Sequence, residues 1–445
     1  MTTSSATSTP FRQSELGRLT AILAGGESAQ LVGIGSVGKS NFTRLLINED
    51  ATRPFLMEPG KFLFVLVDGN KMVEVTTWGL LELMLHQLLR QLRRTNEAAL
   101  LADIAPLYEK AVDPRARDLI FRYLEQAVDV ICQDVDRRLV FVFDEFDAAA
   151  RQLPAQCFAF LRALRDDHKY RLMYVLAMRA ELGRQQGMAH VEPLDDLVSA
   201  NTIWLGPHSP ADAQIVLARL MARSATPMAT DAQQHLLQLT GGHPGLLRAL
   251  FFEMVRAEHN LAWAVDSHGV RAECRRIWEC FTSEEQEVLA RLAFDLDVPP
   301  RLHVILNDLA RKGIAGGAAQ TWAIFSTLWR DYVANNQPRP GERVFVDLER
   351  HVVLVDGRET EALSPLEYRL MEYLYRHAGK ICTRDELLAH VYPDEMGPAG
   401  SGNVSDGRLD AIVKRLRQRV EPDPTEPQFI VTVRGHGLQL LPSGR

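Results

Sequence analysis

The chain has 445 residues, of which 46% are hydrophobic and 24% charged, as in ordinary soluble globular proteins of two to four domains. Its net charge of −7 excludes a basic field over the whole molecule, so any surface that binds nucleic acid must be local. Five cysteines without a C-x-x-C pair, no secretory leader pattern and no apolar run of about 20 residues lead us to expect a cytoplasmic protein with reduced thiols and no membrane contact.

The N-terminal segment is polar, and we expect residues 1–13 to be disordered. From residue 14 to residue 206, apolar strands alternate with helical patterns, which predicts an α/β domain with a parallel sheet and helices on both faces. The expected strands are Gln30–Gly33, Phe62–Val67, Leu139–Phe143, Leu172–Met178 and Thr202–Leu205, and the clearest helical patterns between them are Leu80–Leu92 and Asp118–Ile131.

The first expected strand leads into a glycine-rich loop. The run Gly33-Ile34-Gly35-Ser36-Val37-Gly38-Lys39-Ser40 matches the phosphate-binding pattern G-x-x-x-x-G-K-[ST] at every fixed position. Glycines let the backbone wrap around a phosphate with its N–H groups pointing inward, and the following helix adds the partial positive charge of its N-terminus. Lys39 is expected to reach the β- and γ-phosphates, and Ser40 to ligate Mg²⁺. The alternative is a glycine-rich turn that matches by chance.

A second motif follows the strand expected at Leu139–Phe143. Asp144 and Glu145 come directly after five apolar residues. A buried parallel strand would deliver both carboxylates to its C-terminal edge, where ligands sit in open α/β sheets. Asp144 is expected to hold Mg²⁺, and Glu145 to orient or polarise the attacking water. A core strand that ends in a solvated acidic turn is the alternative, which a complete phosphate loop disfavours.

After Pro207 the strand patterns stop, and we assign residues 207–262 to a helical lid in which Ser209 caps the first helix. In residues 263–335, helical patterns followed by an extended segment outline a winged helix, with a simple helical bundle as the alternative. The expected helices of both regions are Pro210–Ala222, Asp231–Leu239, Gly245–Arg256, Gly269–Phe281, Gln286–Phe294 and Pro299–Lys312, and the expected extended segment is Thr321–Trp329.

A polar, proline-rich stretch at residues 336–341 predicts a linker to a last domain, residues 342–445. This α+β domain begins with short strands and a hairpin turn at Asp356-Gly357. Its expected strands are Arg343–Asp347, His351–Val355, Thr360–Leu363, Phe429–Val433 and Leu438–Leu441, and its expected helices are Pro365–His377, Arg384–Tyr392 and Asp406–Val420.

Residues 342–441 resemble the winged-helix effector domain of OmpR/PhoB-type response regulators. The segments that carry the resemblance are Leu363-Ser364-Pro365-Leu366-Glu367-Tyr368, Gly379-Lys380 with Thr383-Arg384-Asp385-Glu386-Leu387, Leu409 to Arg419, and Ile430-Val431-Thr432-Val433-Arg434-Gly435-His436-Gly437. The resemblance implies that the helix Asp406–Val420 enters the DNA major groove, and that the hairpin around Arg434 contacts the adjacent minor groove or the backbone.

The predicted recognition helix is apolar on one side and cationic on another. At 100° per residue, Arg408, Arg415 and Arg419 share a side, and such a face can neutralise phosphates in a groove. We predict DNA contacts for Arg408, Lys414, Arg415, Arg417 and Arg419, with Arg434 added from the hairpin. The alternative is a solvated basic face. Just before this helix, Met396–Asn403 is expected to be a flexible, glycine-rich insertion.

Residues 14–335 look like a STAND-type ATPase, a signal-transduction relative of AAA+ proteins. Tyr174-Val175-Leu176-Ala177-Met178-Arg179 is similar to the sensor-1 strand of that family, which implies that Arg179 reads the γ-phosphate. Gly241-Gly242-His243-Pro244-Gly245 resembles the G-x-P element of the lid, which implies that Pro244 packs near the adenine. A surface arginine and a Gly-Pro turn that opens a helix are the respective alternatives.

Together these patterns predict a multidomain protein, α/β and α+β, that binds ATP or ADP with Mg²⁺, hydrolyses ATP slowly and switches its C-terminal domain on double-stranded DNA. Nucleotide exchange would open the protein or promote self-association. Two other hypotheses stay open. One is an AAA+ DNA-remodelling or loading ATPase similar to origin-recognition proteins, and the other is a signalling or defence scaffold whose last domain binds protein.

Overall fold

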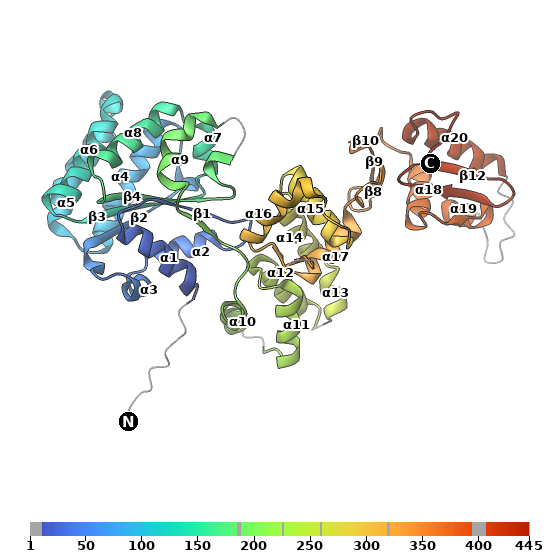
Figure 1. Cartoon of the computed structure of the whole chain (residues 1–445), viewed down its shortest axis with the longest axis horizontal. Helices are drawn as coiled ribbons and strands as arrows, with labels where there is room; N and C mark the ends of the chain where they lie inside the picture. The colour runs from blue at the N-terminus through green and yellow to red at the C-terminus, as the bar shows by residue number, and fades with distance from the viewer. Residues whose placement is uncertain are drawn as a thin grey trace. The chain divides into compact units, whose positions relative to one another are not determined.

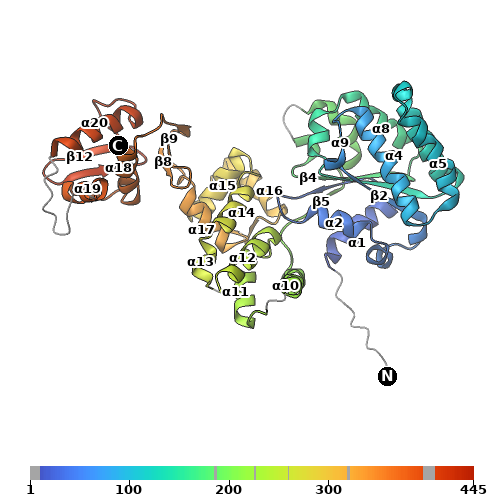
Figure 2. The same cartoon turned by 180° about the vertical axis from the view of Figure 1, so that it is seen from behind.

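The computed structural model describes residues 11–184, 188–224, 227–258, 260–317, 321–393 and 406–444, the side chains of residues 114, 116 and 406 excepted. The chain divides into two compact units, Met1–Thr282 with Val304–Leu328 and Ser283–His303 with Trp329–Arg445. Figures 1 and 2 label the helices and strands of both. The predicted winged-helix region 263–335 contributes to both units, and its boundaries remain predictions.

The first unit is built on a parallel sheet of five strands in the order β2-β3-β4-β1-β5. Each predicted strand is confirmed to within a residue at either end, because long apolar runs bounded by polar residues specify buried parallel strands well. The strands are β1 (Ala29–Val32), β2 (Phe62–Asp68), β3 (Arg138–Asp144), β4 (Leu172–Met178) and β5 (Thr202–Trp204).

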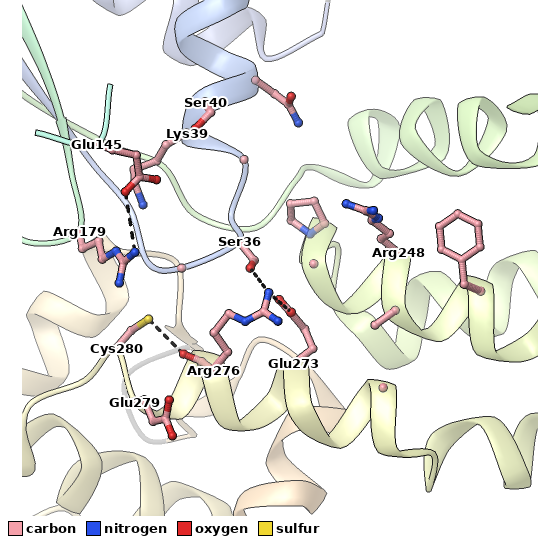
Figure 3. Close-up of a pocket in the computed structure, with 18 residues that line it drawn as sticks. Ser36, Lys39, Ser40, Glu145, Arg179, Arg248, Glu273, Arg276, Glu279 and Cys280 are labelled. Carbon is pink, nitrogen blue, oxygen red and sulfur yellow. Dashed lines mark hydrogen bonds and ion pairs between the residues drawn. The ribbon is translucent and has the colours of Figure 1, made fainter. Parts of the chain in front are cut away.

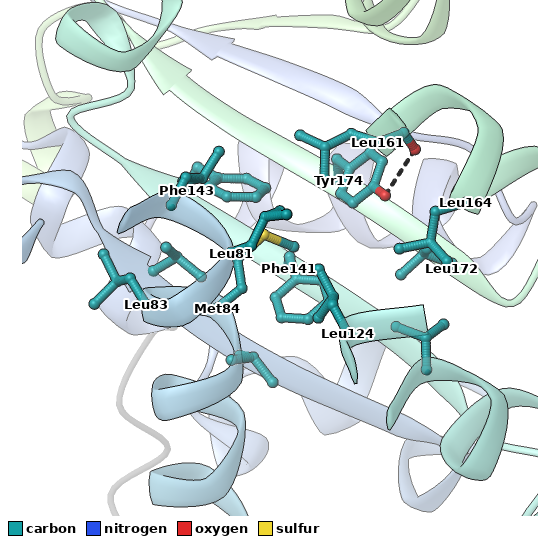
Figure 4. Packing of buried hydrophobic residues seen from close by; sticks show 14 of the residues in the cluster. Leu81, Leu83, Met84, Leu124, Phe141, Phe143, Leu161, Leu164, Leu172 and Tyr174 are labelled. Carbon is teal, nitrogen blue, oxygen red and sulfur yellow. Dashed lines mark hydrogen bonds between the residues drawn. The ribbon is translucent and has the colours of Figure 1, made fainter. Parts of the chain in front are cut away.

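Helices cover both faces of this sheet. Figure 4 shows one face, where leucines of three helices pack against Phe141, Phe143 and Tyr174 of β3 and β4. The other face is covered by α1 and α2 (Figures 1 and 2). The helices of this domain are α1 (Gln13–Ala24), α2 (Lys39–Leu46), α3 (Glu49–Thr52), α4 (Thr77–Arg94), α5 (Ala98–Ala111), α6 (Ile120–Asp129), α7 (Asp147–Gln152), α8 (Ala155–Asp167) and α9 (Glu192–Val198).

The two predicted helices between β2 and β3 differ in outcome. Leu80–Leu92 is confirmed inside α4. The pattern at Asp118–Ile131 is α-helical only from Ile120 to Asp129. A 3-10 segment, Pro114–Leu119, precedes it, and a π-helical turn, Val130–Asp134, follows it. Apolar spacing alone does not distinguish these tighter and wider turns from an α-helix.

The N-terminal prediction was wrong in part. Residues 1–10 lie outside the described residues, but α1 begins at Gln13, and Arg12 is only 2% exposed. The Arg12 guanidinium donates to the Gly206 carbonyl at 2.8 Å and pairs with Glu15 at 2.7 Å. A polar residue near a chain end is therefore ordered here by long-range hydrogen bonds that the sequence pattern does not reveal.

After β5 this unit is helical, as predicted. Ser209 caps α10, because its Oγ accepts the N–H of Asp212 at 3.2 Å. A small antiparallel pair, β6 (Ala315–Gly316) and β7 (Ala323–Ile324), belongs to the same unit. The helices are α10 (Pro210–Ser224), α11 (Thr230–Thr240), α12 (Pro244–Arg256), α13 (Leu261–Val265), α14 (His268–Trp278) and, from its second residue, α16 (His303–Arg311).

The extended segment predicted at Thr321–Trp329 was largely wrong. Only Ala323–Ile324 is a strand, and Thr327 begins the helix α17 (Thr327–Asn336). Trp329, which β-propensity favours in a strand, is fully buried within that helix. Tertiary burial of the aromatic ring has overridden its local preference.

The second unit contains α15 (Ser283–Ala293) and the predicted C-terminal domain. Two small antiparallel sheets, in the orders β10-β9-β8 and β11-β13-β12, frame three helices. Ser364 and Thr383 each open a helix with a capping box, in which Glu367 and Glu386 are the reciprocal partners. The elements are β8 (Val344–Asp347), β9 (Val352–Val355), β10 (Arg358–Glu359), α18 (Pro365–Arg376), β11 (Ile381–Cys382), α19 (Arg384–Val391), α20 (Asp406–Val420), β12 (Ile430–Val433) and β13 (Gly437–Leu440).

The hairpin at Asp356-Gly357 is confirmed, but the strand after it is not where we placed it. Asp356 and Gly357 both have left-handed backbone angles, φ 51° and 75°, as a two-residue turn of this kind requires. The turn therefore joins β9 directly to β10 at Arg358–Glu359, and Thr360–Leu363 is not a strand. The insertion expected at Met396–Asn403 lies outside the described residues. No described helix has the length and apolar character needed to cross a bilayer.

Candidate functional site

The predicted phosphate loop connects β1 to α2 at the carboxyl edge of the sheet. Ser36 and Gly38 take left-handed backbone angles, φ 57° and 96°, which turn the chain back on itself before α2 begins at Lys39. Gly33 leaves no room for a side chain, since a Cβ would meet the Leu205 carbonyl oxygen at 2.9 Å. The loop is thus held in place from the neighbouring strand, and it encloses a concave, glycine-lined surface.

Lys39 is 5% exposed and lies against this loop. Its Nζ donates to the carbonyl oxygens of Gly33 and Ile34 at 2.7 and 3.1 Å. Burial lowers the pKa of the Lys39 ammonium, while the nearby carboxylates of Glu145 and Asp147 act in the opposite direction. Both acceptors of Lys39 are neutral, so a phosphate oxygen would be the stronger partner.

The acidic residues predicted after β3 lie at the same edge of the sheet. Asp144 is 3% exposed, and its Oδ1 has no hydrogen-bond partner in the described part of the chain. Glu145 has a left-handed backbone (φ 52°), which is strained for a residue other than glycine, and Glu145 Oε2 lies 3.7 Å from Arg179 Nη2. The Arg179 backbone N–H donates to Asp147 Oδ1 at 3.0 Å. The structure therefore brings together the ends of β3 and β4 as predicted.

Residues of the phosphate loop, Glu145 and Arg179 line a cavity of about 860 Å³ whose far wall comes from α12 and α14. Figure 3 shows this cavity, with the loop facing the two helices. Among the described residues, its charged side chains are mixed in sign. The cations are Lys39, Arg179, Arg248 and Arg276, the acids are Glu145, Glu273 and Glu279, and the remaining lining residues are Gly35, Ser36, Gly38, Ser40, Asn41, Pro244, Gly245, Ala249, Phe252, Gly269 and Cys280.

The predicted lid element opens α12 beside the loop. His243 is fully buried and caps α12, since its Nδ1 accepts the N–H of Leu246 at 3.3 Å. Pro244 follows as the first helical residue, and a Cβ on Gly38 would lie 3.8 Å from its ring. Pro244 thus lies next to the phosphate loop.

Sequence reasoning missed the contribution of α14 and of Arg248. Arg248 follows Pro244 by four residues, so the helical period alone places both on one face of α12. No comparable signal identifies Glu273, Arg276 or Cys280. These residues reach the cavity only because α14 packs back against α12.

The cavity fits a nucleotide with Mg²⁺. The described residues contain no cluster of three or more His, Cys, Asp or Glu side chains that would hold a metal ion unaided. Mg²⁺ is usually held by one or two carboxylates together with substrate phosphates and water. Asp144 with its unpartnered oxygen, and Ser40 on the cavity wall, suit that arrangement.

In the C-terminal domain, three of the predicted DNA contacts are occupied inside the domain. Arg415 Nε donates to Glu367 at 3.0 Å, and Arg419 Nη1 donates to the Ala362 carbonyl at 2.8 Å. Arg417 Nη2 donates to the Ile430 carbonyl at 2.6 Å and to Thr432 Oγ1 at 2.9 Å. The shared side of Arg408, Arg415 and Arg419 therefore flanks the core rather than lying opposite it.

The outward face of α20 is a different stripe. Gly407, Ala411, Lys414 and Gln418 are exposed and lie opposite the buried stripe of Leu409, Ile412, Val413, Leu416 and Val420. The Arg408 guanidinium lies over the Tyr392 ring at 4.4 Å. Arg434 is exposed at the tip of the β12–β13 hairpin. Of the six predicted cations, Lys414 and Arg434 therefore face outward most directly.

Comparison with known proteins identifies the C-terminal domain. Residues 357–440 match the family described as "Transcriptional regulatory protein, C terminal". The sensory transduction protein RegX3 of Mycobacterium tuberculosis is 44% identical over 98 residues, which are 22% of this chain and 40% of RegX3. The alkaline phosphatase synthesis transcriptional regulatory protein SphR of Synechococcus elongatus is 37% identical over 89 residues, 20% of this chain and 32% of SphR. The chain thus spans less than half the length of these relatives.

Some solved structures align to most of the chain, and others align only to a segment of about a fifth of it. A Walker-type ATPase of Pyrococcus abyssi aligns over 72% of this chain and 95% of its own, with 15% identity and a TM-score of 0.45. The ORC2 protein of Aeropyrum pernix aligns over 73% and 92%, with 12% identity and a TM-score of 0.40. The RstA DNA-binding domain of Klebsiella pneumoniae, solved with the RstA box, covers 22% of this chain and 92% of its own, with 30% identity and a TM-score of 0.19.

The chain therefore carries an OmpR/PhoB-type regulator domain at residues 357–440, joined to an N-terminal domain that resembles P-loop ATPases. The second resemblance rests on the domain's own features. Its sheet order, its phosphate-loop sequence between β1 and α2 and its acidic strand end at Asp144 occur together.

Proposed function

We propose that this protein is a DNA-binding transcription regulator whose C-terminal domain is controlled by the nucleotide, ATP or ADP, held in its N-terminal domain. One observation carries the proposal. The phosphate loop, the acidic end of β3 and the cations of α12 and α14 surround a single cavity of about 860 Å³. A cavity that joins a phosphate cradle to side chains of two separate helices can convert the state of a nucleotide into a conformational change.

In this proposal the loop residues Gly33 to Ser40 bind the phosphates, and Lys39 exchanges its two carbonyl partners for phosphate oxygens. Ser40 and Asp144 hold Mg²⁺, which neutralises the charge of the phosphates. Pro244 borders the base. The nucleotide gives the buried Lys39 ammonium its missing anionic partner.

Glu145 and Arg179 carry the difference between ATP and ADP. In the proposal Arg179 leaves Glu145 and contacts the γ-phosphate, and Glu145 is then free to orient the attacking water. ADP offers no γ-phosphate, so it leaves the pair in place. We propose slow hydrolysis that resets the switch, and an ATP-bound form that opens or self-associates, in the manner of a STAND-type ATPase.

In the C-terminal domain α20 enters the DNA major groove with the stripe around Lys414, and Arg434 contacts the neighbouring backbone or minor groove. Arg408 lies at the rim of this surface. Arg415, Arg417 and Arg419 act indirectly, because their hydrogen bonds to α18, to the loop before it and to β12 hold α20 in position. The relative SphR is named as a transcriptional regulatory protein, and we extend that role to this chain.

The test is DNA selection with the full chain, performed separately with ADP and with a non-hydrolysable ATP analogue. We expect the two nucleotides to give different affinity or valency on the same selected sequence. Cys280 supplies an independent measure of occupancy, because it lines the cavity while the other four cysteines are buried. Nucleotide should protect it from alkylation.

An identical DNA profile and affinity in both states would break the proposed coupling. Absence of any salt-dependent DNA binding would instead favour a scaffold whose last domain binds protein. Nucleotide-dependent oligomerisation on DNA with fast turnover would favour a remodelling ATPase.

A further inference from the structure

Three side chains form a connected line across the cavity, from the phosphate loop to α14 (Figure 3). Arg276 Nη1 lies 3.5 Å from Ser36 Oγ and 2.9 Å from Glu273 Oε2. The Arg276 side chain is 62% exposed, whereas that of Glu273 is 8% exposed. The guanidinium is therefore the solvent-exposed member of the line, and the carboxylate is the buried one.

Glu273 is incompletely satisfied. Its Oε1 has no hydrogen-bond partner in the described part of the chain. It is confined by the start of α12, because a Cβ on Gly245 would collide with that oxygen and with the Ser36 side chain. A buried carboxylate with one unpartnered oxygen is costly, so the ion pair with Arg276 is its main compensation.

The turn that follows α14 also reaches the loop. The Cys280 thiol donates to the Arg276 carbonyl at 3.2 Å, and a Cβ on Gly35 would lie 2.9 Å from its sulfur. The backbone around Arg276 is therefore packed against the segment of the loop that contains Gly35 and Ser36. The Arg276 guanidinium therefore already lies within hydrogen-bond distance of the loop.

We propose that Arg276 is a phosphate-binding residue, and that Glu273 competes with the bound nucleotide for it. This inference rests on the proposed nucleotide binding. The phosphate groups of ATP or ADP attract the exposed guanidinium away from Glu273, since an arginine forms parallel hydrogen bonds with phosphate oxygens. The exchange leaves Glu273 buried without a counter-charge.

The exchange links nucleotide binding to the position of α14. With nucleotide bound, α14 is favoured to move so that Glu273 reaches water, because an unpaired buried carboxylate is unfavourable. Without nucleotide, the Arg276–Glu273 pair within α14 compensates the buried carboxylate, and the contact of Arg276 with Ser36 joins α14 to the loop. The pair thus lowers nucleotide affinity, and α14 is the element whose position depends on whether nucleotide is bound.

The experiment is calorimetric titration of ATP and ADP into the full chain carrying Arg276→Ala, Arg276→Lys, Glu273→Gln or Arg276→Ala with Glu273→Gln. Arg276→Ala should weaken binding about tenfold, which is the size of a charge-assisted contact, and Arg276→Lys should restore part of the loss. Glu273→Gln should strengthen binding about threefold to tenfold. The double variant should behave like Arg276→Ala, because the competitor matters only while Arg276 is present.

Two matched controls separate the pair from general electrostatics. Glu279→Gln removes the same charge from the same cavity wall, and Arg271→Ala removes a cation from α14 outside the cavity lining. Both should leave affinity within about twofold of the parent. Circular dichroism verifies folding, and Arg276→Lys replaces Arg276→Ala as the decisive variant if the latter is unfolded.

If Glu273→Gln strengthens binding no more than Glu279→Gln does, the competition is wrong. If both Arg276 variants bind like the parent while Lys39→Ala does not bind, Arg276 is not a phosphate ligand, although the proposed function stands. If the parent itself binds no nucleotide, the proposed function fails, and this inference fails with it.

Discussion

The phosphate loop and the helix α20 were both predicted as anion-binding elements, but their side chains differ in what they contact in the structure. In the loop, the predicted binding depends on backbone N–H groups and on one lysine, and five motif residues, Gly35, Ser36, Gly38, Lys39 and Ser40, line one cavity. In α20 the prediction depended on counting cations along one helix. Three of its five cations point back to partners on α18, on the loop before it and on β12.

The difference teaches that a motif which specifies backbone shape is safer to interpret than one which specifies charge. Glycines at fixed spacing leave the chain few conformations. An arginine with a long flexible stem can instead bind whichever carboxylate or carbonyl the fold presents, and Glu367 already presents a buried one. The domain from residue 342 onward also has 17 acidic against 14 basic residues, so intradomain partners are plentiful.

The largest expected effect tests the loop. Lys39→Ala removes the ammonium that lies against the Gly33 and Ile34 carbonyls, and we expect nucleotide affinity to fall by more than about 100-fold. Calorimetric titration of ATP measures it. Lys61→Ala, which removes a surface lysine paired with Glu58, is the control and should bind as the parent does. Parent-like ATP binding by Lys39→Ala would remove the loop from the site.

A second change separates binding from turnover at the same edge of the sheet. Glu145→Gln keeps the size of the side chain but removes the charge that orients water, so we expect ATP to bind and phosphate release to fall by about 100-fold or more. Phosphate release under saturating ATP measures it. Glu279→Gln, on the opposite cavity wall, should hydrolyse at the parental rate. Undiminished turnover in Glu145→Gln would exclude the proposed role.

A pair of substitutions sharpens the distinction within α20. Lys414→Ala should weaken DNA binding about tenfold and lower the slope of log affinity against log salt concentration by about one, because Lys414 faces outward. The stability of the domain should be unchanged. Arg417→Ala should instead destabilise the domain by about 1–3 kcal/mol, because it leaves the Ile430 carbonyl without these donors.

DNA titrations at several salt concentrations and denaturant unfolding, applied to both variants, measure these effects. Lys380→Ala, an exposed lysine away from α20, is the control. If Arg417→Ala lost DNA affinity and salt dependence at parental stability, the assignment of the two roles would be reversed.

The smallest expected effect is the pH dependence of stability that comes from the buried histidines near the loop. Burial lowers the pKa of His243 to about 3 and that of His208 to about 4. Below about pH 6.5 the unfolded chain therefore binds protons that the folded chain does not. The contribution of these histidines to the free energy of unfolding is fully present above that pH and falls as the pH decreases toward 4. Each histidine contributes a slope of at most about 1.4 kcal/mol per pH unit.

Asparagine can replace His243 as a helix cap without titrating, so His243→Asn should flatten this decline. Unfolding in denaturant at pH values from 4 to 7 measures it, with the exposed His436 changed to Asn as the control. An unchanged slope in His243→Asn would mean that His243 is charged in the folded protein.

The sequence by itself determined the strands of the parallel sheet, the phosphate-loop motif between β1 and α2, the acidic end of β3, the cap at Ser209 and the hairpin at Asp356-Gly357. Each of these depends on residues that are neighbours in the chain, so the local pattern contains the physical cause. The roles assigned to the individual site residues remain predictions.

Only the tertiary structure decided that Arg12 is buried and that Trp329 lies in a helix. It also decided that Arg276 meets the loop, and that Arg415, Arg417 and Arg419 form hydrogen bonds within their domain. These outcomes depend on which carboxylate or carbonyl the fold brings within reach of a long side chain. Residues that are far apart in sequence supply those partners, and no local pattern contains that information.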